Sequence, residues 1–239
     1  MMLEDVALLV ADTCRSRIYL QTLREAELLP SAAILLDGAN DKHLLKVSEE
    51  HAIIEEKGVS YNLRTPVAKL LRGMGITTMI SDSGDPNAED TIEKILGLPQ
   101  KNIIYSGPIG VILKDTILGC RKKFIHVHPG VLPRFRGSTT VYYSLIKEGK
   151  VGASAFFMDR KIDNGPLIMQ RDFPAFEHPQ AIDCFYDSYM RSQLLKEVLE
   201  LYLESGDFAT KEQSKSGETE SYYVIHPILK SIAIYRKRE

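Results

Sequence analysis

Two histidines carry the most suggestive chemistry in this sequence. His126 and His128 stand two positions apart at the end of a short apolar run, directly before a Pro-Gly turn. Alternate side chains of a strand share a face, so both imidazoles are expected on one side, with Ile125 and Val127 pointing into the core. Ligands of open parallel sheets bind at the carboxyl ends of the strands, where both histidines are expected to lie.

A second segment supplies a carboxylate. Residues 157–167 read FMDRKIDNGPL, in which a predicted strand runs into a loop that carries Asp163 just before a Gly-Pro turn. We expect this turn to place Asp163 over the neighbouring strand end. An Asp that faces a His fixes the orientation of the imidazole and stabilises its protonated form. His126, His128 and Asp163 are therefore the predicted catalytic residues.

The elements that must position these residues alternate along the chain. Short apolar runs predict buried strands, and amphipathic stretches between them predict helices. The predicted strands cover residues 6–10, 32–36, 77–81, 102–106, 124–127 and 153–158, and the predicted helices cover residues 16–28, 65–74, 90–96, 139–147 and 179–204. This alternation indicates an α/β fold with a Rossmann-like, mostly parallel sheet and helices on both faces.

The end of the chain is predicted to stand apart from this sheet. Residues 210–220 are polar and are predicted to form a loop, and residues 222–234 form a short segment of undefined structure. We therefore predict a catalytic domain over residues 1–208 and a short C-terminal appendage over residues 209–239. The sequence contains neither GxGxxG after the first strand nor GxxxxGK[ST], which disfavours a conventional dinucleotide enzyme and a P-loop kinase.

Composition and charge limit the class of protein. The 239 residues include 44 % hydrophobic and 26 % charged residues, with a net charge of −2, as in ordinary globular proteins. Nucleic acid is not the expected partner, because proteins that bind phosphate backbones usually carry a basic excess. The three cysteines show no CxxC spacing, and we identify neither a signal peptide nor a membrane span. We expect a cytoplasmic protein.

The segments that carry the chemistry resemble the formyltransferase family that uses 10-formyltetrahydrofolate. That family includes glycinamide ribonucleotide transformylase, methionyl-tRNA formyltransferase and sugar N-formyltransferases. The resemblance covers residues 100–170 well and rests on the spaced motifs His126-Val127-His128-Pro129, Leu132-Pro133, Arg136-Gly137 and Asp163-Asn164-Gly165-Pro166. By this resemblance, His128 and Asp163 match the catalytic His and Asp of the family. His126 stands where the family carries an Asn that donates a hydrogen bond to the formyl oxygen, and an imidazole N–H can also donate one.

The resemblance implies the formyltransferase fold and a reaction. The reaction is transfer of a formyl group from 10-formyltetrahydrofolate, with no metal, to a primary amine or hydroxylamine of a small molecule or peptide. One wall of the implied pterin slot comprises Gly107, Ile112, Leu113 and Ile117, and the other comprises Phe157, Met158, Asp159 and Ile162. Arg136 and Ser138 are implied to hold an anionic group of the substrate.

Several alternatives stay open at this point. A formyltetrahydrofolate hydrolase or a carbamoyl-type transferase would use the same fold, and a binding module would have lost catalysis through His126. Two histidines and a carboxylate also match the ligand types of a metal enzyme, with His126, His128 and Asp163 as the ligands. The acceptor amine is undefined, and the appendage is expected to pack either on its own chain or on the second subunit of a homodimer.

Overall fold

The computed structural model describes residues 1–38, 41, 44, 47, 52–176, 181–214 and 220–235. The chain divides into two compact units, Met1–Ile125 and His126–Glu239, so the boundary between them falls inside strand β7 (Lys123–His128). The predicted boundary at residue 208 concerns the C-terminal appendage and stays a prediction.

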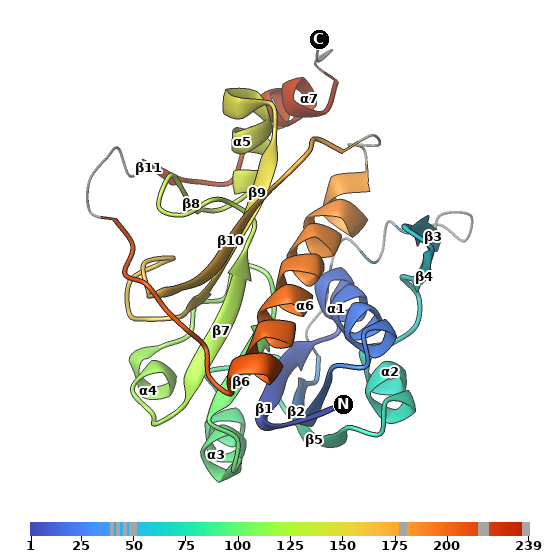
Figure 1. Cartoon of the computed structure of the whole chain (residues 1–239), viewed down its shortest axis with the longest axis vertical. Helices are drawn as coiled ribbons and strands as arrows, with labels where there is room; N and C mark the ends of the chain where they lie inside the picture. The colour runs from blue at the N-terminus through green and yellow to red at the C-terminus, as the bar shows by residue number, and fades with distance from the viewer. Residues whose placement is uncertain are drawn as a thin grey trace. The chain divides into compact units, whose positions relative to one another are not determined.

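Seven strands form the main sheet, in the hydrogen-bonded order β10-β9-β7-β6-β1-β2-β5 (Figure 1). The first unit supplies β1 (Met2–Ala11), β2 (Leu29–Leu36), β5 (Thr77–Ser81) and β6 (Asn102–Ser106). Each pair of neighbours among them is parallel, and β6 also pairs in parallel with the start of β7. The second unit contains β9 (Val151–Phe157) and β10 (Leu167–Phe173), which pair antiparallel. The predicted α/β class and mostly parallel sheet are confirmed.

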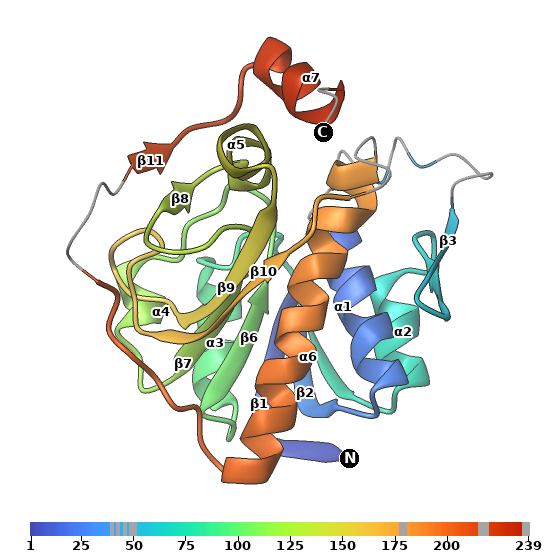
Figure 2. The same ribbon diagram turned by 45° about the horizontal axis from the view of Figure 1, so that its top comes forward.

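Helices cover the sheet of the first unit on both faces (Figure 2). The helices are α1 (Cys14–Glu25), α2 (Val67–Gly73) and α3 (Glu89–Gly97). The chain moves from β1 towards β5 through α1 and α2, and it returns to β6 through α3. Because parallel crossovers are right-handed, α3 must lie on the face opposite α1 and α2.

The sequence did not predict the hairpin of β3 (Ile53–Glu56) and β4 (Val59–Asn62) or the single turn α4 (Asp115–Leu118).

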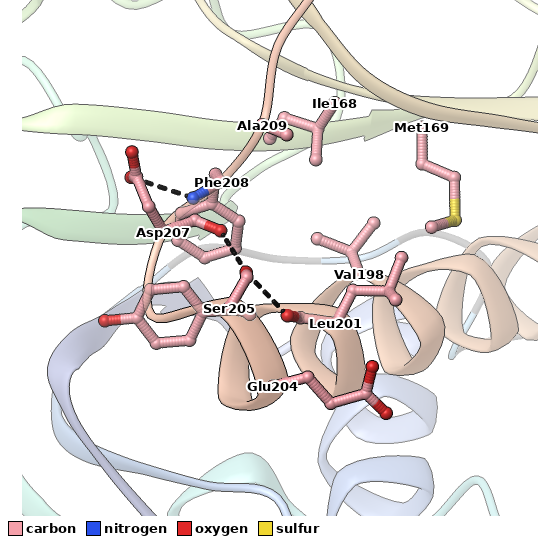
Figure 3. Close-up of a pocket in the computed structure, with 10 residues that line it drawn as sticks. Ile168, Met169, Val198, Leu201, Glu204, Ser205, Asp207, Phe208 and Ala209 are labelled. Carbon is pink, nitrogen blue, oxygen red and sulfur yellow. Dashed lines mark hydrogen bonds between the residues drawn. The ribbon is translucent and has the colours of Figure 1, made fainter.

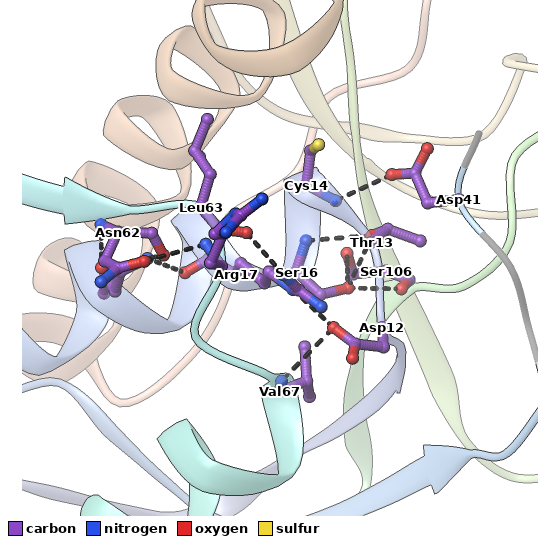
Figure 4. Close-up of polar contacts among 12 residues, drawn as sticks. Asp12, Thr13, Cys14, Ser16, Arg17, Asp41, Asn62, Leu63, Val67 and Ser106 are labelled. Atoms are coloured by element: carbon purple, nitrogen blue, oxygen red, sulfur yellow. Dashed lines mark hydrogen bonds and ion pairs between the residues drawn. The ribbon is translucent and has the colours of Figure 1, made fainter. Parts of the chain in front are cut away.

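Polar contacts fix the start of α1 at the carboxyl end of β1 (Figure 4). The Thr13 hydroxyl caps the helix by accepting a hydrogen bond from the Ser16 N–H at 3.1 Å. The Ser16 hydroxyl donates to the carbonyl oxygen of Ser106, at the end of β6, at 2.9 Å. Arg17 pairs with Asp12 at 2.6 Å. The Thr13 side chain therefore satisfies a backbone N–H that the start of a helix would otherwise leave without a hydrogen-bond partner.

The second unit holds the remaining helices, α5 (Thr140–Glu148), α6 (Asp187–Ser205) and α7 (Pro227–Tyr235). A π-helical turn, Ile182–Tyr186, precedes α6, and α6 packs on β9 and β10. This confirms the long helix that the apolar pattern predicted, although the first residues of the predicted range lie outside the described residues. None of the described helices is both long and apolar enough to cross a bilayer.

The described C-terminal segment packs on its own chain. Strand β11 (Glu220–Tyr222) pairs in parallel with β8 (Phe135–Gly137), and α7 contacts α5. The ring of Tyr222 stacks on Phe135, with centroids 5.6 Å apart. The appendage therefore covers the loop that follows the two histidines.

Two isoleucines on neighbouring strands of the main sheet test how β2 and β5 pack. Ile34 on β2 is fully buried, whereas Ile80 on β5 is 57 % exposed. We expect Ile34→Ala to lower the free energy of unfolding by about 2–5 kcal/mol, because it leaves a cavity in the core. The same change at Ile80 should cost under about 1 kcal/mol. Urea denaturation measures both, and equal losses would contradict the observed orientation of β2 and β5.

Candidate active site

Strand β7 ends on His128, whose side chain is almost fully buried. Its Nε2 lies 2.7 Å from the carbonyl oxygen of Phe135 and 3.3 Å from the hydroxyl of Thr140. Because a carbonyl oxygen can only accept, Nε2 carries the hydrogen and donates it to Phe135. The ring is thereby fixed, with Nδ1 as the edge that remains for chemistry.

Asp163 faces that edge of the imidazole. One carboxylate oxygen, Oδ2, lies 3.5 Å from His128 Nδ1 and accepts a hydrogen bond from the N–H of Gly137 at 2.9 Å. The separation of 3.5 Å is longer than a good hydrogen bond, and catalytic contacts of this kind often tighten only when a ligand binds. The structure thus places Asp163 over the end of the strand that carries His128.

A tight turn holds Asp163 in place. Asp163 has a left-handed backbone with φ of +51°, a conformation that Asp tolerates better than most residues. Two residues later, a Cβ atom on Gly165 would overlap the carbonyl oxygen of Phe157. The N–H of Phe157 donates to the carbonyl oxygen of Pro166 at 3.0 Å. Only glycine fits this close approach, which explains the Gly in the Asp163-Asn164-Gly165-Pro166 motif.

His126 is the more exposed of the two imidazoles. It lies on β7, is half-buried, and meets the ring of Phe156 edge-on, with centroids 5.9 Å apart and an interplanar angle of 88°. As alternate residues of one strand, His126 and His128 share a face of the sheet. Its exposure leaves His126 more accessible than His128 to a bound molecule.

The surroundings of His128 set its charge. Burial lowers the pKa of His128 below its ordinary value, because the imidazolium loses its solvation. The carboxylates of Asp163 and Asp187 and the hydrogen bond to Phe135 oppose this effect, whereas the guanidinium of Arg191 adds to it. Asp187 and Arg191 form an ion pair on α6 at 3.0 Å. The site therefore holds a neutral imidazole beside a carboxylate, a pair able to take up one proton.

Gln213, which the sequence did not single out, binds the same loop. Its Nε2 donates to the carbonyl oxygens of Asp163, at 3.0 Å, and Gly165, at 2.9 Å. Its Oε1 accepts from Nη2 of Arg136 at 2.8 Å. Gln213 lies in the polar stretch predicted to be a loop, where no apolar period or motif signals a site.

The two residues predicted to hold an anionic substrate group lie beside the Gly137 N–H. Arg136 on β8 is half-buried and donates to Gln213, and its buried Nε has no hydrogen-bond partner among the described residues. Ser138 is exposed, and its backbone N–H donates to the carbonyl oxygen of Tyr222 at 2.8 Å. Their roles toward a substrate stay predictions.

The first set of residues predicted to line a pterin slot lies in the first unit. The carbonyl oxygen of Gly107 accepts a hydrogen bond from Nη2 of Arg15 at 2.5 Å. Leu113 and Ile117 are buried, whereas Ile112 is exposed. Arg15 was not among the predicted site residues, because it lies far along the chain from the segment that carries the motifs. The folate contacts of this set stay predictions.

The second set lies in the second unit. Phe157 is buried and meets Phe208 edge-on, with centroids 5.8 Å apart. Met158 packs against a buried cluster of Leu132, Phe156 and Leu167. Asp159 accepts a hydrogen bond from the N–H of Lys161, and Ile162 is exposed. These folate contacts also stay predictions.

The geometry does not support the alternative hypothesis of a metal site formed by His126, His128 and Asp163. In the part of the chain that the structure describes, no group of three or more His, Cys, Asp or Glu side chains is arranged to hold a metal ion. His126, His128 and Asp163 therefore do not form such a group. Nε2 of His128 is in addition bonded to Phe135.

A separate pocket of about 280 Å³ lies in the second unit, between β10, the end of α6 and the segment that follows α6 (Figure 3). Its lining is mainly apolar and includes Met169, Val198, Leu201 and Phe208, with Glu204 as a charged member. None of the predicted site residues lines this pocket.

The segment that carries these residues is similar to a known protein family. Residues 87–189, which include both histidines and Asp163, match the model of the formyl transferase family. This segment is therefore similar to the formyl transferase family. A methionyl-tRNA formyltransferase from Ehrlichia canis is 30 % identical over 141 residues, which are 57 % of this chain and 45 % of that protein. The chain thus spans less than half of that relative's length.

Solved structures show the same fold. A phosphoribosylglycinamide formyltransferase from Anaplasma phagocytophilum superposes with a TM-score of 0.58 at 17 % identity, covering 92 % of this chain and 96 % of that one. A sugar 3N-formyl transferase, solved in the presence of dTDP and 5-N-formyl-THF, gives a TM-score of 0.53 at 14 % identity. That match covers 92 % of this chain and 70 % of the other. The predicted formyltransferase fold is confirmed.

The environment of His128 leads to a direct test. We expect Asp163→Asn to lower the pKa of His128 further, because a neutral amide no longer favours the imidazolium. Nuclear magnetic resonance of histidine-labelled protein measures this titration, with the His128 signal assigned through a His128→Gln variant. A pKa of His128 that is unchanged or raised in folded Asp163→Asn protein would contradict the contact between the two side chains.

Proposed function

We propose that this chain transfers a formyl group from 10-formyltetrahydrofolate to a primary amine. The observation that carries the proposal is the buried His128, oriented by Phe135 and faced by Asp163 at 3.5 Å, within a segment that matches the model of the formyl transferase family. A buried pair that can accept one proton suits acyl transfer from a carrier to an amine, because the attacking nitrogen must lose a proton.

The reaction places a separate demand on each side chain. The amine nitrogen attacks the formyl carbon, and the bond from that carbon to the folate nitrogen then breaks. His126 donates an N–H to the oxyanion that forms, in the position where the family carries Asn. The pair of His128 and Asp163 takes the proton from the attacking amine, and the proton then passes to the departing folate nitrogen. No metal enters this scheme.

Arg136 and Ser138 bear on the identity of the molecule that accepts the formyl group. The half-buried guanidinium of Arg136, two residues from the exposed Ser138, supports an acceptor that carries a carboxylate or phosphate group. A net charge of −2 favours a small molecule or peptide over a nucleic acid. Methionyl-tRNA, which the relative from Ehrlichia canis is named for, is the alternative acceptor that an assay must include.

A hydrolase is the second candidate reaction. The same imidazole and carboxylate could activate water, and the formyl group would then leave as formate. Release of formate in the absence of any amine separates this reaction from transfer.

The exposed side of the C-terminal segment favours a homodimer, one of the two outcomes expected for the appendage. Tyr223, Val224, Ile228 and Tyr235 are exposed apolar side chains of residues 223–235. Lys230, the one charged residue among the described residues of this segment, pairs with Asp183 of the same chain. An uncharged apolar surface of this kind is suited to contact a second copy of itself.

The pair of His128 and Asp163 gives the main prediction. We expect His128→Ala and Asp163→Ala each to reduce formyl transfer by at least about a hundredfold, because general acid–base catalysis contributes about 10²–10⁴. Transfer from 10-formyltetrahydrofolate is measured across amino acids, amino sugars, peptides and methionyl-tRNA, with circular dichroism as the control for folding. Near-wild-type turnover by folded His128→Ala protein would overturn the assignment.

His126 gives a second prediction. We expect His126→Asn to retain transfer, because an amide also offers one donor to the oxyanion, whereas His126→Ala should lose about 3 kcal/mol of transition-state stabilisation. The ratio kcat/KM for the two variants, measured with one acceptor, reports this difference. Equal activity of the Ala and Asn variants would show that position 126 supplies no hydrogen bond.

A further inference from the structure

We propose that Gln213, from the C-terminal appendage, is a positioning residue for Asp163. The inference rests on the proposed function for its kinetic consequence, but its structural content is tested independently of turnover. It assigns to the appendage a task inside the site, beyond covering the neighbouring loop.

Three hydrogen bonds and the peptide link between Arg136 and Gly137 form a closed ring that includes Asp163. Gln213 Nε2 donates to the carbonyl oxygen of Asp163 at 3.0 Å, and the Asp163 carboxylate accepts from the N–H of Gly137 at 2.9 Å. Gly137 follows Arg136 in the chain, and Arg136 Nη2 returns to Gln213 Oε1 at 2.8 Å. The ring therefore fixes both partners of the hydrogen bond that aims Asp163 at His128.

The partners of Gln213 use the full capacity of its amide nitrogen. The two hydrogens of Nε2 point to two carbonyl oxygens, those of Asp163 and Gly165, and Oε1 points to a guanidinium. Carbonyl oxygens cannot donate and a guanidinium cannot accept, so only one orientation of the amide satisfies all three contacts. Gln213 is also buried, so water does not easily replace these bonds.

The turn that carries Asp163 needs such support. Asp163 adopts the left-handed region with φ of +51°, which costs free energy for a residue other than glycine. Its side chain and its carbonyl oxygen are held by different segments of the chain, Gly137 and Gln213 respectively. Loss of Gln213 would leave the carbonyl oxygens of Asp163 and Gly165 without these bonds and release the turn.

The appendage is anchored next to Gln213. Residues Leu167 and Lys211 exchange backbone hydrogen bonds in both directions, at 2.8 Å and 2.9 Å. This bridge is made by backbone atoms, and the side chain of Lys211 is exposed. Lys211→Ala therefore leaves the bridge and serves as a matched control for a change at Gln213.

The test compares Gln213→Met with Asp163→Asn. Met keeps the approximate length of the side chain and removes all three hydrogen bonds. We expect the pKa of His128 to fall in Gln213→Met protein, as in Asp163→Asn protein, because the carboxylate moves away from the imidazole. The other groups that act on His128, namely Arg191 and Asp187 of α6 and the carbonyl of Phe135, are unchanged in this variant. Histidine-labelled protein gives the titration.

Activity supplies the second readout. We expect Gln213→Met to lower kcat by about ten- to a hundredfold, the cost of a misplaced group, with KM for the formyl donor little changed. In an Asp163→Asn background, the same change should add no further loss, because Gln213 acts through Asp163. Lys211→Ala should match the wild type in both readouts.

Two results would overturn the inference. One is an unchanged His128 titration in folded Gln213→Met protein, and the other is an additive loss in the double variant. If Gln213→Met does not fold, Arg136→Met breaks the ring on its other side, and a fall in the pKa of His128 is again required. A wild-type chain without formyl transfer would refute the proposed function, while the titrations would still decide the role of Gln213.

Discussion

One carboxylate oxygen connects the parts of the candidate site. Oδ2 of Asp163 accepts the N–H of Gly137 and faces Nδ1 of His128. For this atom to lie there, β7 must end on His128, β8 must bring Gly137 alongside, and the turn after β9 must hold a left-handed Asp163. The C-terminal appendage also reaches Asp163, because Gln213 donates to its backbone carbonyl oxygen. Segments far apart in sequence therefore meet around Asp163.

The burial of His128 determines what this arrangement can do chemically. An exposed imidazole would be protonated and deprotonated by water near neutral pH. Here burial lowers the pKa of His128, and the adjacent carboxylate partly offsets that effect. Burial therefore favours the neutral imidazole, which can accept a proton from an attacking amine. His126, half-buried and two residues earlier, retains the exposure that contact with a substrate requires.

The sequence predicted the parts of the fold that have strong local patterns. Buried parallel strands such as β1 contain continuous apolar runs, and α6 is long with apolar residues at helical spacing, so both could be predicted from the sequence pattern. The pairing of β8 with β11 spans three residues per strand, too few for a period, and it depends on contacts between distant segments. His128 and Asp163 lie in motifs. Gln213 lies in a polar stretch, and its importance arises only from where the folded chain places it.

The central claim, that His128 and Asp163 serve a folate-dependent formyl transfer, is tested most directly by titrating the protein with a stable analogue of 10-formyltetrahydrofolate. Calorimetry gives the binding, and elemental analysis of the same sample gives the metal content. The account predicts saturable binding in metal-free protein, weakened by substitution of Asp163. Absence of binding, together with about one iron or zinc per chain, the stoichiometry of a 2-His-1-carboxylate site, would contradict it.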